Sequence, residues 1–111
     1  MRVLFGLFAL LSLGAAAYHL VGLFHMVNDS PFWRNALFVV VDVFCAYGFR
    51  RRPRWFVWFF GALAVQQCYG HGGSLVRAHM EGHIPWLDIG VVLFMAIALA
   101  ALIVHARRPE M

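Results

Sequence analysis

Four long apolar runs constrain this chain more than any other feature of its sequence. They cover residues 3–27, 31–49, 55–72 and 84–104, each close to the roughly 20 residues that a helix needs to cross a bilayer. The runs are continuous rather than alternating, and a helix that is apolar on every side belongs in lipid or in a very large core. A chain of 111 residues cannot build such a core. The sequence therefore predicts membrane-spanning helices.

The composition agrees with lipid as the solvent. Hydrophobic residues make up 63% of the chain and charged residues only 13%, about half the charged share of an ordinary soluble domain. Four spans use nearly all of the chain, which leaves no room for a separate soluble domain. We therefore expect one all-α domain over residues 1–111: an antiparallel bundle of four transmembrane helices in the lipid bilayer.

The first run has a second interpretation, as a secretory signal peptide. Arg2, an apolar stretch and the alanines at 15–17 follow the order found in such signals. However, the apolar run continues unbroken to Val27, which favours an uncleaved first helix. Cleavage would leave three helices and an N-terminus on the outer side.

The arginines predict the orientation of the helices. All nine basic residues are arginine, and seven of them lie at the two termini and between the second and third runs: Arg2, Arg50, Arg51, Arg52, Arg54, Arg107 and Arg108. Basic residues that flank spans stay cytoplasmic, so we expect both termini inside and a multi-pass protein of the cell inner membrane. The net charge of +4 is then a topology signal or a contact with anionic lipid, and it does not indicate nucleic-acid binding.

Most histidines gather on the expected outer side, which makes this face histidine-rich. His71, His79 and His83 fall within thirteen residues, and His25 can approach them from the end of the first run. Imidazole nitrogens beside a carboxylate such as Glu81 suit zinc or copper. The alternative is a polar external loop whose histidines face water.

A second hypothesis for the histidines is a b-type haem. Counting about 1.5 Å per residue from the inner arginines places His19 and His71 at the same depth, near 25 Å. Two imidazoles on neighbouring helices can ligate a haem iron axially. The candidate cofactors are therefore zinc, copper and haem.

Asp42 is the acidic residue nearest the middle of the expected membrane, about 12 Å from the inner arginines by the same count. An acid at this depth is costly and by default marks an ion or proton path, in which Gln67 of the third helix would take part. The alternative is a carboxyl that bonds to Asn35, Gln67 or Tyr18 and holds the helices together. The sequence leaves both hypotheses open.

Asp88 carries a structural expectation. It follows Pro85 closely and is expected in the first turn of the last helix. A carboxylate there complements the helix dipole.

No nucleophile–base pair and no cofactor motif is apparent in the sequence, so we expect a protein that is not an enzyme. The leading hypothesis is an accessory subunit or partner in a membrane complex, with the histidine-rich outer face as a metal or haem site. The alternative is a small proton-coupled transporter that uses Asp42. It would be a homo-oligomer, because four helices enclose little cavity.

Overall fold

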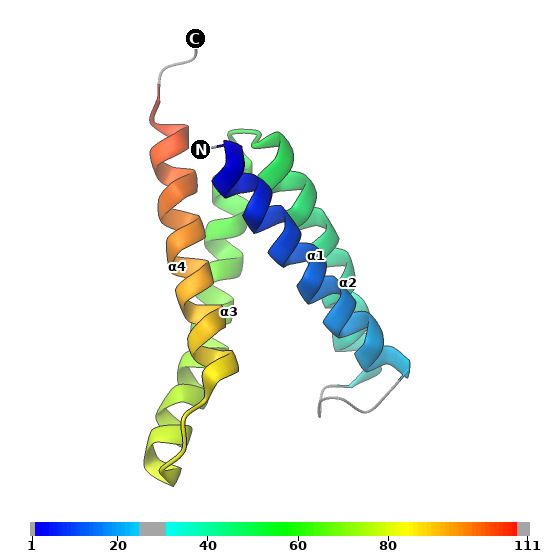
Figure 1. The fold of residues 1–111 in the computed structure, drawn as a ribbon, viewed down its shortest axis with the longest axis vertical. Helices are drawn as coiled ribbons and strands as arrows, with labels where there is room; N and C mark the ends of the chain where they lie inside the picture. The colour runs from blue at the N-terminus through cyan, green and yellow to red at the C-terminus, as the bar shows by residue number, and fades with distance from the viewer. Residues whose placement is uncertain (1, 25–30, 109–111) are drawn as a thin grey trace. The chain divides into compact units, whose positions relative to one another are not determined.

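The structure is a computed structural model that describes residues 2–24 and 31–108. Within these ranges the chain forms four α-helices and no strand (Figure 1). The helices are α1 (Arg2–Phe24), α2 (Phe32–Arg51), α3 (Phe56–Glu81) and α4 (Trp86–Ala106). The predicted all-α class is confirmed.

Three of these helices are long and apolar enough to cross a membrane. The most apolar stretch of 18 residues has a mean hydropathy of 1.9 in α1, 1.3 in α2 and 2.7 in α4. Among the described helices α3 is the exception, although its 26 residues exceed the length of a span. Polar residues in α3, among them Gln66, Gln67 and Arg77, keep it below the hydropathy of a candidate span.

The chain divides into two units, each of them a helical hairpin. The first unit, Met1–Pro53, contains α1 and α2. These helices run antiparallel, because Phe5 at the start of α1 stacks on Phe49 near the end of α2, with 6.5 Å between ring centroids. At the other end of the hairpin the amide of Asn35 donates to the carbonyl oxygen of Gly22. Small buried residues such as Ala16 and Ala46 let the two helices approach closely.

The end of α2 is set by Arg52 and the proline after it. Proline disfavours the right-handed helical conformation in the preceding residue, and Arg52 adopts the left-handed one, with φ 52°. Its backbone N–H donates to the carbonyl oxygen of Gly48, which closes the last turn. Its guanidinium lies 5.1 Å from the ring centroid of Phe5, so this turn is also tied to the start of α1.

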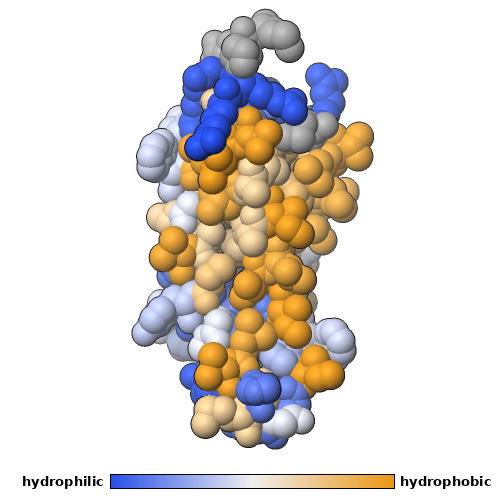
Figure 2. All heavy atoms as spheres, turned by 90° about the vertical axis from the view of Figure 1, so that its left-hand side faces the viewer, coloured by the Kyte–Doolittle hydropathy of each residue, from blue (hydrophilic) through white to orange (hydrophobic). Residues whose placement is uncertain are grey.

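The second unit, Arg54–Met111, contains α3 and α4. These helices also run antiparallel, with Phe60 edge-on to Phe94 at a ring-centroid distance of 6.4 Å. Figure 2 views the side of α4: apolar side chains cover its middle, and hydrophilic ones gather at the end where α4 terminates. That end carries the exposed Arg107 and Arg108.

The predicted end of the third helix at residue 72 is wrong. The helix continues through Gly70, Gly72 and Gly73 to Glu81, so the expected external loop is shortened to residues 82–85. Glycine in a helix costs about 1 kcal/mol relative to alanine, which weakens the helix without ending it. The helix ends at Gly82, whose φ of 77° is the left-handed conformation that glycine adopts at little cost.

Candidate functional site

The first hairpin holds a cluster of three polar side chains, His19, Asn35 and Asp42, called the His19 cluster below. His19 comes from α1. Asn35 and Asp42 come from α2, seven residues apart and therefore on one face of that helix. His19 Nδ1 lies 3.1 Å from Asn35 Oδ1, and His19 Nε2 lies 3.8 Å from Asp42 Oδ2. One imidazole thus stands between an amide and a carboxyl group.

The imidazole of His19 is held by its ring neighbours as well as by its polar partners. It stacks on Phe38 of α2, with 5.2 Å between centroids and 24° between planes. Tyr18 meets it edge-on. Asn35 is 1% exposed, so the amide that faces Nδ1 is fully buried. These contacts fix the ring plane and direct Nε2 toward Asp42.

One carboxyl oxygen of Asp42 has no hydrogen bond to the described residues. This atom is Oδ2, and it is buried. The 3.8 Å separation from His19 Nε2 is longer than a hydrogen bond. A buried acceptor without a donor costs about 1–3 kcal/mol.

The contact between His19 and Asp42 was not anticipated from the sequence, which assigned Asp42 to Asn35, Gln67 or Tyr18. Gln67 lies in the second unit, where its amide nitrogen donates to Gln66 Oε1 at 2.6 Å. Its coupling to Asp42 stays a prediction. A signal for the observed pair did exist, since His19 and Asp42 lie on the polar faces of two helices joined by a short connection.

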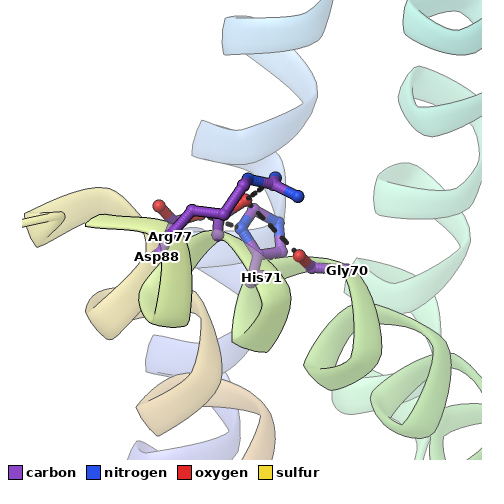
Figure 3. A network of polar contacts seen from close by, with 5 residues as sticks. Gly70, His71, Arg77 and Asp88 are labelled. Carbon is purple, nitrogen blue, oxygen red and sulfur yellow. Dashed lines mark hydrogen bonds and ion pairs between the residues drawn. The ribbon is translucent and has the colours of Figure 1, made fainter. Parts of the chain in front are cut away.

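The second hairpin holds a pair formed by His71 of α3 and Asp88 of α4 (Figure 3). His71 Nδ1 lies 2.6 Å from Asp88 Oδ1, and both side chains are partly buried. Asp88 does lie in the first turn of α4, as expected, but it makes this contact with α3 as well. A carboxylate only accepts, so in this contact Nδ1 donates to Asp88 Oδ1.

Beside this pair, a short polar ladder follows α3 toward its end. Ser74 donates to the carbonyl oxygen of Gly70 at 3.4 Å, and Arg77 donates to Ser74 Oγ at 3.1 Å. Figure 3 shows Arg77 and Gly70 on either side of His71. These local bonds occupy polar groups along the glycine-containing stretch of α3, where the sequence suggested a loop.

Those of the predicted zinc or copper ligands that lie in the described residues are not brought together. Within the described part of the chain no group of three or more His, Cys, Asp or Glu residues is placed to hold a metal ion. His71 and His79 lie eight residues apart on one helix, about 12 Å along its axis. Glu81 does approach His83, at 3.7 Å, but both are well exposed. His25 lies outside the described residues.

The predicted haem ligands, His19 and His71, belong to different units, so haem ligation stays a prediction. Each of the two imidazoles is already oriented at Nδ1, by Asn35 and by Asp88 respectively. That arrangement is typical of histidines that ligate metals or haem iron, whose second nitrogen is usually fixed by an amide, a carbonyl or a carboxylate. Comparison with protein-family models, with curated proteins and with solved structures finds no match for this chain.

Proposed function

We propose that this chain is a small multi-pass protein of the cell inner membrane that acts as a non-enzymatic subunit or partner in a membrane complex. The supporting observation is how little of each apolar helix is covered. In the most apolar 18-residue stretch of each helix, the buried share is only 22% in α1, 28% in α2 and 17% in α4. Since nearly the whole chain is helical hairpin, its binding surface would lie within the membrane.

Large apolar side chains are available for such a surface on both hairpins. Leu10 of α1 and Val40 of α2 are each 67% exposed, and Ile97 of α4 is 55% exposed. Packing of one helix against another is the main source of association energy inside lipid. A second membrane protein can therefore replace lipid on these faces.

The experiment is native purification of the tagged full-length chain in lipid nanodiscs. We expect one or a few membrane proteins to co-purify in a fixed ratio that survives a second affinity step. An unrelated tagged four-helix protein, expressed at the same level, is the control for lipid-mediated carry-over. A chain that is recovered alone, or only with copies of itself, would contradict the subunit role.

The proposed topology places both termini and the arginine-rich connection inside, with α3 crossing the membrane. A reporter that is active only in the cytoplasm should work after Met111 and fail when inserted in the 82–85 connection. Activity at both positions would mean that α4, which separates them, does not cross. The reverse pattern would refute either the orientation or the crossing of α3.

A second candidate function, a small proton-coupled transporter, is favoured by one specific observation. Among the residues that the structure describes, Asp42 Oδ2 is a buried acceptor without a donor, and it faces an imidazole of the first hairpin. An acid in a membrane span is a functional candidate by default. Asn cannot gain or lose a proton, so a transporter predicts that Asp42→Asn removes the cellular phenotype at normal membrane level. The subunit role predicts wild-type behaviour, and Asp88→Asn serves as the matched control in the other hairpin.

A further inference from the structure

We infer that His19 and Asp42 together form a site for a single shared proton inside the first hairpin, and that Asn35 fixes the tautomer that makes the sharing possible. This inference concerns the state of the pair, and it holds whether the chain is a subunit or a transporter. It follows from three contacts taken in order.

The first contact fixes the orientation of the Asn35 amide. A backbone carbonyl oxygen only accepts hydrogen bonds, so the 3.4 Å contact with Gly22 O must come from the Nδ2 end of the amide. The Oδ1 end then faces His19, as the 3.1 Å distance to Nδ1 shows. With Asn35 1% exposed, water does not compete for either end.

The second contact fixes the tautomer of His19. An amide oxygen only accepts, so Nδ1 must carry a hydrogen to bond with it. A neutral imidazole has one N–H, and with that hydrogen on Nδ1 the other nitrogen, Nε2, presents a bare lone pair. Stacking on Phe38 holds the ring in the plane that aims this lone pair at α2.

The third contact places this lone pair opposite a second one. Nε2 faces Asp42 Oδ2 at 3.8 Å, and that oxygen has no hydrogen-bond partner in the described residues. Two acceptors cannot bond to each other. One proton placed between them creates a single N–H···O or N···H–O hydrogen bond, for which the atoms need to approach to about 2.6–3.0 Å.

The charge balance favours occupancy of this site in a membrane. Without the extra proton, neutral His19 and ionised Asp42 carry a net charge of −1. One proton taken from water makes the pair neutral overall, either as imidazolium and carboxylate or as imidazole and carboxylic acid. No other bond forms or breaks. A neutral, hydrogen-bonded pair is far cheaper to hold in a span than an isolated carboxylate.

Other titratable groups face the pair from both helices of the hairpin. Tyr18 is edge-on to His19, and Cys45 is buried one turn beyond Asp42 on α2. Arg34 lies over the ring of Phe38, 5.7 Å from its centroid. An assay must therefore read the imidazole and the carboxyl group individually.

The experiment combines two probes on the full-length chain in lipid nanodiscs. Nitrogen NMR of ¹⁵N-labelled histidine reports the proton on each ring nitrogen, and His19→Gln identifies the His19 signals. Infrared difference spectra report the carboxyl band that Asp42→Asn removes. We expect Nδ1 to be protonated throughout, and the Nε2 signal and the Asp42 band to change together in the step in which the pair takes up its first proton, because the steps of a coupled pair belong to both groups.

Variants then separate the proposed roles. Asn35→Leu has a similar volume but no acceptor, so a proton on Nε2 should appear in the neutral ring of His19. Asp42→Asn should shift the midpoint of the His19 signals, whereas Asp88→Asn should leave it unchanged.

The inference is overturned by an Asp42 band that stays constant in the step that changes the Nε2 signal, by a neutral ring with bare Nδ1, or by a His19 midpoint that Asp42→Asn does not change. The first two results are read from the unaltered chain once its His19 signals and Asp42 band have been assigned.

Discussion

The His71–Asp88 contact should couple α3 to α4 by an amount that a double-mutant cycle can measure. The perturbations are His71→Ala, Asp88→Ala and the two together. Asp88→Ala also removes a favourable charge from the first turn of α4, but this term cancels in the cycle. What remains is the interaction between the two side chains.

The expected magnitude follows from the geometry of the pair. Hydrogen bonds between membrane helices average about 0.6 kcal/mol and reach about 1.7 kcal/mol. The 2.6 Å distance to a carboxylate oxygen places this bond in the upper part of that range. Side-chain exposures of 27% and 21% leave it accessible to competing water, which lowers its strength. We expect a coupling free energy of about 1–1.5 kcal/mol.

The assay is reversible unfolding of the reconstituted protein, with probes on α3 and α4 so that separation of the second hairpin is measured directly. Glu81 and His83 provide the matched control. They are 3.7 Å apart with side chains 67% and 60% exposed, so their cycle should give no measurable coupling. A His71–Asp88 coupling as small as the control would refute the assignment of this contact as a tie between the helices.

Three further outcomes follow from the structure. Gly82→Ala should destabilise the second hairpin by about 1 kcal/mol in the same unfolding assay, because φ of 77° strains any residue with a Cβ; no loss would contradict the left-handed cap. Phe49→Ala removes a fully buried ring from the α1–α2 contact and should cost about 2–3 kcal/mol, below the range for soluble cores because lipid is also apolar. The control Trp58→Ala, at a ring 81% exposed, should change stability little, and equal losses would contradict the packing. A membrane-permeant thiol reagent should label the partly exposed Cys68 faster than the buried Cys45, and faster labelling of Cys45 would contradict their burial.

The sequence predicted the helices well where apolar residues alone decide the outcome. The runs at 31–49 and 84–104 match α2 and α4 to within two residues at each end. The error at the end of α3 has a local cause. Glycines at 70, 72 and 73 resemble a loop in composition, whereas the residues between and after them continue the helix and bond along it.

Two effects bring His19 and Asp42 closer together than a count of residues along each helix predicts. Phe5 packs against Phe49, and these rings lie three residues from Arg2 and one residue from Arg50, so the depth origins on α1 and α2 differ by two residues, or about 3 Å. Side chains also lean toward the N-terminus of their own helix. In an antiparallel hairpin this brings His19 and Asp42 toward each other, which a count of Cα positions cannot register.

The His71–Asp88 contact was missed for a related reason. The sequence does place Asp88 in the first turn of α4, where the structure has it. Its partner depends on α3 continuing past His71 and on a connection of only four residues, 82–85, that returns the chain directly beside it. Because a long loop was expected after residue 72, there was no basis in the sequence for predicting a contact between His71 and Asp88.

The short 82–85 connection also bears on how α3 enters a membrane. By length and composition α3 is not among the candidate spans, whereas α4 has the highest mean hydropathy of the three candidates, 2.7. The connection has only four residues, so we expect α3 and α4 to insert into the membrane together as a hairpin. The favourable transfer of the apolar α4 would then offset the cost of transferring the polar groups of α3. The His71–Asp88 bond removes part of that polar cost before transfer, since each group reaches lipid already paired. In the proposed topology, the insertion of α3 therefore depends on α4.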